Sequence, residues 1–316
     1  MSTQIIRRLL TLVPVLSVVG VVVFVLIHVA PGDPAAVMAG DSATTERIEQ
    51  LRHEMGLDRP LLEQFWTWVT HALQGDLGDS YFLAQPVSTS LVQRMEPTGL
   101  LTLYALVLSI VIGLPSGIIA AVRRNSWVDR LMMGTSLGGV CIPTFWFGII
   151  LILAFAVWLH WLPAAGYVSL MDDPLGNLRY LLMPAFSLGL QSAALLARVV
   201  RSSMLEALRE DYVRTARAKG LRENLVVVRH ALPNALIPAL TIIGNSIGTL
   251  LGGAVVTEVV FNTPGIGQLV VQSVLRRDFP VIQGAILAIA AVYVLVNLLV
   301  DIAYVIADPR IRQSSR

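Results

Sequence analysis

The dominant pattern in this sequence is a series of long apolar runs separated by polar stretches. A helix needs about 20 largely apolar residues to cross the hydrocarbon core of a bilayer. Six runs reach that length and predict membrane-spanning helices: Leu9–Ala30, Thr98–Val122, Leu131–Leu159, Tyr180–Ala197, Ala235–Val260 and Val281–Ala307. The first run is longer than the roughly 7–15 apolar residues of a signal peptide, so we interpret it as a retained span. The pattern predicts an all-α polytopic membrane protein with six transmembrane helices.

Two polar connections between these runs are too long to be simple turns. Residues 31–97 contain a segment, Thr44–Met55, with the spacing of an amphipathic helix that ends near Gly56, followed by Trp66 and Trp68, which suit a membrane interface. Residues 198–234 form the second long connection. The predicted organisation is therefore an N-terminus and first span (1–30), an extracytoplasmic segment (31–97), a five-helix core (98–307) that includes loop 198–234, and a tail (308–316).

Composition and charge support the membrane assignment and give it an orientation. The chain is 55% hydrophobic and only 14% charged, whereas soluble domains carry about 25% charged residues. Of the 23 basic residues, 16 fall in the N-terminus, the 123–130 loop, the 198–234 loop and the C-terminus. Because basic loops stay on the cytoplasmic side, both termini are predicted to be cytoplasmic.

Loop 198–234 carries the most specific local pattern. Acidic residues begin its first predicted helix and basic residues end it, with Glu210 and Arg214 spaced as a favourable ion pair. Gly220 suits the position after that helix. Asn224 could cap a second helix, whose continuation Pro233 and Pro238 would limit. Such a compact helical pair suits a docking surface. The alternative is an ordinary basic loop that touches anionic lipid headgroups.

The same loop resembles the conserved cytoplasmic loop of ABC importer permeases. That family's pattern is Glu-Ala-Ala, three residues, Gly, nine residues, an aliphatic residue, any residue and Leu-Pro. Here Arg214-Thr215-Ala216 occupies the triplet, Gly220 the glycine and His230-Ala231-Leu232-Pro233 the end. The departures from the pattern, within Tyr212–Leu221 and Arg229–Ala235, resemble the dipeptide/oligopeptide/nickel branch. Companion motifs of that branch occur in order at Pro31–Pro34, Gly56–Pro60, Gly75–Gly78, Phe261–Gly267 and Asp308–Arg310.

This resemblance implies a type I ABC importer permease of the bacterial inner membrane, and the long 31–97 segment is typical of the first permease of a pair. Implied partners are a second permease, two ABC ATPase subunits that hold ATP and Mg²⁺, and an extracytoplasmic solute-binding protein. Short peptides are the implied cargo, with glutathione, nickel chelates, opines and small glycans left open. The residues implied to couple to the ATPase are Tyr212, Arg214, Thr215, Ala216, Arg217, Lys219, Gly220, His230 and Pro233.

The predicted spans contain a second group of candidate residues. Gly244, Gly248 and Gly252 recur every four residues, with Asn245 and Thr249 between them. Small residues at this spacing allow close helix approach, either within the chain or against a second permease along the path. Glu258 and Asp301 are acids in or near spans, and such residues are candidates for a gate or an intramembrane polar contact.

Several other classes of function find no support in the sequence. Lys219 is the only lysine and no phosphate-binding loop surrounds it, so ATP must be hydrolysed on another chain, or an ion gradient must drive transport. The five histidines lack metal-ligand spacing, and no catalytic motif or nucleic-acid-binding pattern is present. The sequence therefore predicts a non-enzymatic chain without a cofactor of its own. A secondary transporter stays as the alternative, although the inverted repeats expected of one are not evident.

Overall fold

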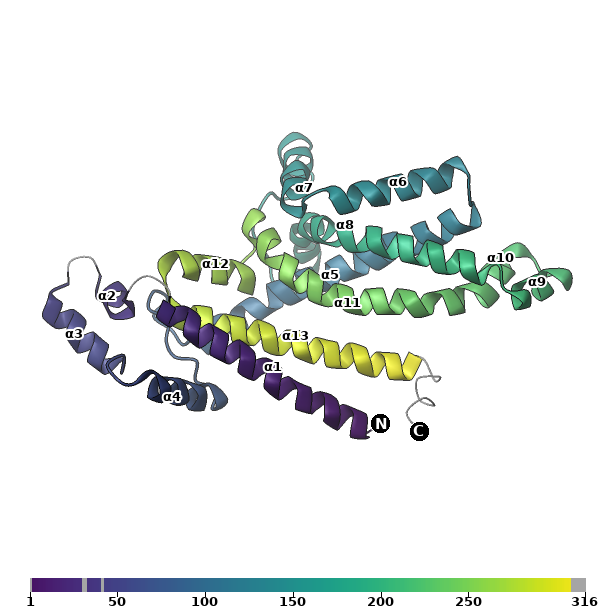
Figure 1. Ribbon diagram of the computed structural model, residues 1–316. Helices are drawn as coiled ribbons and strands as arrows, with labels where there is room; N and C mark the ends of the chain where they lie inside the picture. The colour runs from purple at the N-terminus through teal and green to yellow at the C-terminus, as the bar shows by residue number, and fades with distance from the viewer. Residues whose placement is uncertain (1, 30–32, 41–42, 308–316) are drawn as a thin grey trace. The chain divides into compact units, whose positions relative to one another are not determined.

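A computed structural model describes the backbone of residues 2–29, 33–40 and 43–307, with the side chains of residues 14–25, 28–29, 33–40 and 43–300. These residues are almost entirely helical, which confirms the predicted all-α fold, and the β structure described in them is an isolated bridge between Asp79 and Pro86. The chain divides into two compact units, whose helices Figure 1 labels. Unit 1 comprises Met1–Glu96 and Gly265–Leu295, and unit 2 comprises Pro97–Pro264 and Val296–Arg316.

Unit 1 consists of α1, α2, α3, α4, the start of α5, α12 and the start of α13. Their bounds are α1 Ser2–Val29, α2 Pro34–Ala39, α3 Thr45–Glu54, α4 Leu61–Leu73, α5 Val87–Val122, α12 Ile266–Arg276 and α13 Phe279–Ala307. Its apolar core joins α5, α12 and α13 through Val87, Leu91, Ile266, Leu269, Val281 and Ala285. The predicted helix after Thr44 is confirmed as α3, because the Thr44 hydroxyl caps it and Gly56, at φ +66°, follows its end.

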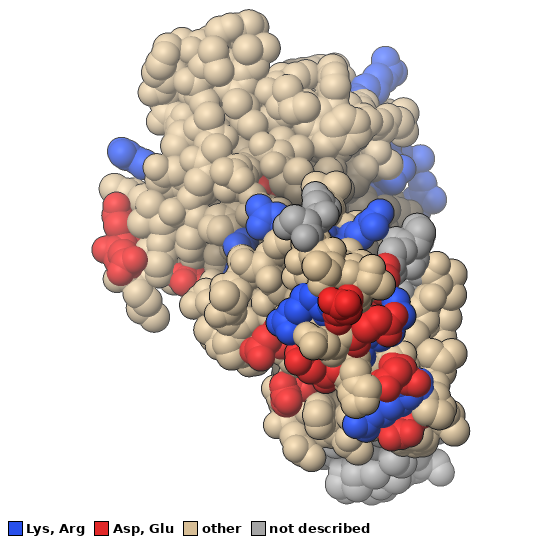
Figure 2. Space-filling view, turned by 90° about the vertical axis from the view of Figure 1, so that its left-hand side faces the viewer, with Lys and Arg blue, Asp and Glu red and all other residues tan. Residues whose placement is uncertain are grey.

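Charged side chains of both signs are interleaved on part of the face shown in Figure 2. Within unit 1, Arg52 of α3 donates to the Asp33 carboxylate at 2.5 Å and to Glu49 at 2.9 Å. Asp33 also accepts from the backbone N–H of Ala35 at 3.0 Å and so caps α2. The carboxylate therefore ties α2 to α3.

Unit 2 contains the remaining helices. Their bounds are α6 Trp127–Cys141, α7 Thr144–Leu151, the π-helix η1 Ile152–Trp158, α8 Pro174–Ala207, α9 Asp211–Ala218, α10 Glu223–Leu225, the π-helix η2 Val226–Ala231 and α11 Leu232–Val260. α8 and α11 lie side by side (Figure 1). Leu101 and Ala105 of α5 pack with Leu181, Ala185 and Leu188 of α8 and with Leu250 and Ala254 of α11. α8 is thus the central helix of the unit.

Glycines bring α5 and α8 into backbone contact. A Cβ at Gly189 of α8 would lie 2.5 Å from the carbonyl oxygen of Ala105, and a Cβ at Gly117 of α5 would lie 2.5 Å from that of Ala197. Both distances are shorter than real contacts, so only glycine fits. Gly117, two residues after Pro115, therefore serves helix packing.

One predicted span differs from the structure. Leu131–Leu159 is not a single straight helix, because α6 and the helix that follows it are bent by 105° at the break between Cys141 and Thr144. The physical reason lies in the residue before Pro143. A proline disfavours the α conformation of its predecessor, and Ile142 is extended, with φ −79° and ψ 124°.

The other predicted spans correspond to helices. Among the described residues, four helices are long and apolar enough to cross a membrane: Val87–Val122, Pro174–Ala207, Glu223–Val260 and Phe279–Val300. The bent α6–α7 pair counts as a fifth if it is one broken span, and the first predicted span coincides with α1, in which Pro14–Val25 is the apolar stretch with described side chains. The total of six spans and the placement of the termini stay predictions.

Candidate functional site

The predicted coupling loop forms a compact knob, defined here as residues 209–233, at one end of α8 and α11 (Figure 1). α9 leads from α8, and α10 and η2 lead back into α11. Two residues of α9, Val213 and Ala216, are buried against Val226 and Ala231 of η2 and Met204 of α8. The knob therefore rests on an apolar base shared with two long helices of unit 2.

A glycine and an ion pair fix the turn within the knob. Gly220 has φ +74°, a left-handed conformation that favours glycine, and an added Cβ there would meet no atom within 4 Å. Arg217 of α9 donates two hydrogen bonds to the Glu223 carboxylate, at 2.6 and 3.0 Å. Hydrogen bonding to that carboxylate raises the pKa of Arg217 above its ordinary value. This pair spans the turn and joins α9 to α10.

The structure places most predicted coupling residues on the surface of the knob. The exposed ones are Tyr212, Arg214, Thr215, Arg217, Lys219, Gly220 and Pro233. Ala216 is buried in the apolar base, and His230 is half-buried. The Tyr212 hydroxyl accepts a hydrogen bond from the Asn234 side chain at 2.8 Å. This bond attaches the start of α9 to the start of α11.

Three details of the sequence interpretation of this loop are wrong. Arg214 contacts Asp211 at 3.3 Å and not Glu210. The second helix is capped at Arg222 and not at Asn224. It also continues through Pro233 into α11, because the wider π turns of η2 precede the proline and accommodate its missing N–H.

Sequence reasoning missed an apolar patch on the knob. Leu225 and Val228 are 41% and 61% exposed, and both line a surface hollow with Gly220, Leu221, Arg222 and Asn224. Apolar residues exposed beside a basic helix are typical of a protein-binding surface.

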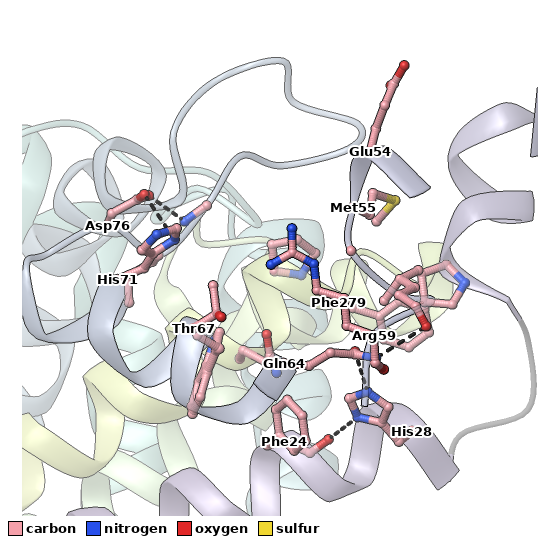
Figure 3. A pocket seen from close by; sticks show the side chains of 18 of the residues that line it. Phe24, His28, Glu54, Met55, Arg59, Gln64, Thr67, His71, Asp76 and Phe279 are labelled. Atoms are coloured by element: carbon pink, nitrogen blue, oxygen red, sulfur yellow. Dashed lines mark hydrogen bonds and ion pairs between the residues drawn. The ribbon is translucent and has the colours of Figure 1, made fainter. Parts of the chain in front are cut away.

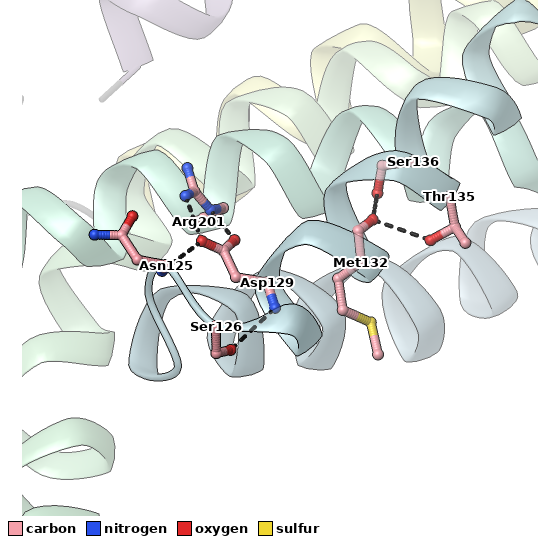
Figure 4. Close-up of polar contacts among 7 residues, drawn as sticks. All are labelled: Asn125, Ser126, Asp129, Met132, Thr135, Ser136 and Arg201. Carbon is pink, nitrogen blue, oxygen red and sulfur yellow. Dashed lines mark hydrogen bonds and ion pairs between the residues drawn. The ribbon is translucent and has the colours of Figure 1, made fainter.

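A second ion pair braces the end of α8 that supports the knob (Figure 4). The Arg201 guanidinium donates to both oxygens of Asp129, at 2.6 and 2.8 Å. Asp129 also accepts from the backbone N–H of Asn125, and its own N–H donates to the Ser126 hydroxyl. This network fixes the start of α6 against α8. It was not anticipated, because the partners are 72 residues apart.

The predicted glycine stripe of α11 and the polar residues beside it differ in their exposure to solvent. Gly244 is buried and Gly248 half-buried, whereas Asn245, Thr249 and Gly252 are exposed. A Cβ at Gly252 would meet open space, but a Cβ at Gly253 would lie 2.9 Å from Leu188 of α8. Gly253 therefore makes the close packing contact, and Asn245, Thr249 and Gly252 share an uncovered small, polar face.

The structure describes the side chain of one of the two candidate acids, Glu258 and Asp301. Glu258 is fully buried in unit 2, where the Thr98 hydroxyl donates to its carboxylate at 2.6 Å. This contact links the outer part of α5 to the end of α11. The side chain of Asp301 lies outside the described residues, so its predicted role stays a prediction.

Unit 1 contains a pocket of about 390 Å³ between α1, α4 and the start of α13 (Figure 3). Its polar groups contact one another. His28 lies 3.2 Å from the side-chain oxygen of Gln64, whose amide donates to the carbonyl of Arg59, and His71 lies 3.8 Å from Asp76. The pocket lies at the junction of α1 and α4, and the described residues include no cluster of metal-ligating side chains.

Comparison with known proteins identifies relatives along the whole chain. Residues 113–313 match the family described as "binding-protein-dependent transport system inner membrane component", and residues 1–102 match the N-terminal family of such components. The glutathione transport system permease protein GsiC of Escherichia coli strain K12 is 45% identical over 99% of both chains. A Brucella abortus protein, whose name assigns it provisionally as a peptide transport system permease, is 44% identical over 99% of both.

A solved structure supports the fold. A chain of the MetNI methionine ABC transporter, determined in inward-facing conformations, aligns with a TM-score of 0.58 over 69% of this chain and 96% of its own length. The sequence identity is 21%, so the likeness concerns the fold alone. The matches give no support to the alternative of an ion-gradient-driven transporter.

Proposed function

This chain belongs to the family of binding-protein-dependent transport system inner membrane components, and we propose that it is the permease that forms, with a second permease, the path of an ATP-driven importer of short peptides. Membership establishes a multi-pass inner-membrane permease of the ABC importer class. The proposal adds the partners, the coupling surface and the cargo. ATP and Mg²⁺ would be bound by separate ATPase subunits, and a solute-binding protein would deliver the cargo.

The knob is the observation that carries the coupling proposal. Its outer surface combines a cationic helix with the exposed apolar Leu225 and Val228, while Val213 and Ala216 hold it on a buried base. The turn is fixed by Gly220 and by the Arg217–Glu223 pair. A rigid, two-sided projection of this kind can dock into a groove of an ATPase. Closure of the ATPase dimer would then move the knob and switch the access of the path between the two sides.

The exposed face of α11 is the proposed path-facing or permease-facing surface. Asn245, Thr249 and Gly252 offer small and polar groups without a fixed charge. A path lined by such groups accepts varied side chains, as a peptide importer requires. Glu258 lies on the buried side of the same helix, and we assign it a positioning role between α5 and α11.

Co-purification tests the coupling surface. The complete transporter is purified through a tag on the ATPase, and recovery of this permease is measured. Arg214→Glu and Val228→Asp are expected to reduce recovery at least about tenfold, because each places a carboxylate on the proposed contact. Arg130→Glu is the matched control, since Arg130 is an exposed arginine outside the knob, in the first turn of α6, on the basic, predicted cytoplasmic side. Recovery of both knob variants at the level of the control would contradict the proposal.

The names of the relatives support the cargo proposal. The Brucella relatives are named for peptide transport and the Escherichia coli relatives for glutathione transport, and glutathione is itself a short peptide. The solute-binding protein encoded with this permease is the direct test. Titration of it with dipeptides, tripeptides and glutathione is expected to show saturable binding to at least one of them, and binding only of nickel chelates or glycans would contradict a peptide cargo.

A further inference from the structure

α4 has a wider apolar surface than unit 1 covers. On one side of the helix, Phe65 and Trp68 pack against α1, with ring centroids 5.2 and 6.1 Å from that of Phe24. Trp68 also lies against Gly20, where an added Cβ would be 3.7 Å from the indole ring. Figure 3 shows the outer end of this contact, with His28 and Phe24 below Gln64. This side of α4 is accounted for by α1.

A second apolar side of α4 is uncovered. Leu62, Trp66 and Leu73 are 71%, 59% and 82% exposed, and Val69 between them is half-buried. Positions i, i+4, i+7 and i+11 lie on one line along an α-helix. The polar residues Glu63, Thr67 and Thr70 lie on a third side of the helix, roughly 100° around from this line. We call Leu62, Trp66, Val69 and Leu73 the α4 stripe.

The neighbouring helix has an exposed stripe of the same kind. Val18, Val22 and Val29 of α1 are 64%, 51% and 74% exposed. They follow helical spacing along the first predicted span. Because α1 belongs to an inner-membrane protein and this stripe is purely aliphatic, its natural neighbour is lipid.

The geometry of the contact places the two stripes together. Gln64 lies at His28 and Trp68 at Gly20, so α4 runs antiparallel to α1. At about 100° per residue, each stripe is rotated by roughly 100–140° from its helix's contact line, in the sense of increasing residue number. For antiparallel neighbours these rotations lead to the same side of the pair. The α1 and α4 stripes therefore form one apolar surface.

We propose that α4 is an interfacial helix whose stripe contacts phospholipid in the leaflet at the C-terminal end of α1. A tryptophan within the stripe suits the headgroup level, where an indole buries its ring and keeps its N–H hydrated. An amphipathic helix with a Leu/Trp face and a separate polar face lies in this region of a bilayer. The lipid contact holds residues 61–73 of the extracytoplasmic segment on the membrane beside α1.

Spin labels test this contact in the assembled transporter, in nanodiscs of phosphatidylethanolamine and phosphatidylglycerol. In a Cys141→Ala background, single cysteines replace Trp66 and Leu73, Glu63 and Thr70 as polar-side controls, and Val22 as a lipid-side control. Spin labels at positions 66 and 73 are expected to collide more often with oxygen than with a water-soluble nickel chelate. The label at position 22 is expected to show the same preference. Chelate access equal to that at 63 and 70 would overturn the proposal. Exclusion of both reagents would also overturn it, because protein would then cover the stripe.

A second measurement avoids labels that could disturb the helix. Brominated phospholipids quench tryptophans that contact lipid. The quenchable fluorescence lost in Trp66→Phe is expected to exceed that lost in Trp68→Phe several-fold, since Trp68 is packed on α1 and Trp66 is not. An equal loss in the two variants would contradict the proposal.

Discussion

Gly220 shapes the knob through one backbone angle. Its φ of +74° is unfavourable for a residue with a Cβ, yet the space around it is open. A substitution there strains the turn without creating a clash. The cost therefore falls on the orientation of α9 relative to η2, and not on the packing of the buried base.

Replacing Gly220 with aspartate is expected to uncouple transport while the protein still inserts. A non-glycine residue at positive φ costs roughly 1–3 kcal/mol, and about 1.4 kcal/mol corresponds to a tenfold change in an equilibrium. We expect substrate uptake by reconstituted vesicles to fall at least about tenfold, with normal membrane levels of the protein. Gly75→Asp is the matched control, because Gly75 has φ +84° and open space but lies outside the knob. Equal uptake by the two variants would argue against a coupling role.

The Asp129–Arg201 pair makes a testable contribution to stability. Asp129 is 4% exposed and accepts three hydrogen bonds, two of them from Arg201. Asp129→Asn is expected to lower the free energy of unfolding by roughly 1–3 kcal/mol, and the partial exposure of Arg201 favours the lower end. Thermal unfolding in detergent measures the change. Asp211→Asn removes a weaker, exposed pair with Arg214 and is expected to leave the transition unchanged, so equal shifts in both variants would contradict the argument.

At this scale the sequence predicts residues whose role is local. The positive φ of Gly220 and the cap at Thr44 follow from residue type and position in a helix. The pairs Arg217–Glu223 and Asp129–Arg201 do not, because one crosses a turn and the other joins helices far apart in the chain. The sequence also suggested the wrong partner for Arg214, because Glu210 and Asp211 both lie within about one helical turn of it and the pair forms with Asp211.

At the scale of elements, α11 presents two faces that adjacent glycines distinguish. Gly253→Val is expected to destabilise the protein by roughly 1–3 kcal/mol, because its Cβ would press on Leu188 at 2.9 Å. Gly252→Val meets open space within this chain and is expected to leave monomer stability intact but to reduce uptake or assembly with the second permease. Thermal unfolding of the isolated permease and uptake by the full transporter separate these effects. Normal uptake with Gly252→Val would remove α11 from the path.

Hydropathy predicts helices where composition decides, but it carries no information on their direction. Hydropathy located α5, α8, α11 and α13 because a span needs only sufficient apolar length. The same test cannot sense the 105° bend before α7, since both arms are equally apolar. The expectation that Pro233 limits the second knob helix was also wrong, because the chain continues helically through Pro233 at the start of α11.

For the whole molecule, orientation is the most direct prediction. In a Cys141→Ala background, single cysteines replace Glu49 and Arg214, and a membrane-impermeant maleimide is added to cells whose inner membrane is intact. The cysteine at position 49 is expected to react directly, and the cysteine at position 214 only after the inner membrane is permeabilised. The reason is the excess of basic residues around the knob, which stays on the cytoplasmic side. Both positions are exposed in the chain, so access alone decides. The reverse labelling pattern would invert the proposed topology.

Whole-molecule properties follow unequally from this sequence. The apolar runs predict a membrane protein and the ordered motifs predict its family, and the family match confirms both predictions. The cargo is not evident from these runs and motifs, because the proposed path-facing residues Thr249 and Gly252 would discriminate little between solutes.

The shared base of the knob has a mechanical consequence. Val213 and Ala216 touch α8 through Met204 and α11 through the π turns before it, and α8 is in turn locked to α5 by glycine-to-carbonyl contacts. A force applied to α9 would therefore be transmitted to α8, α11 and α5 together, because these helices pack directly on one another with no flexible linker between them and α9.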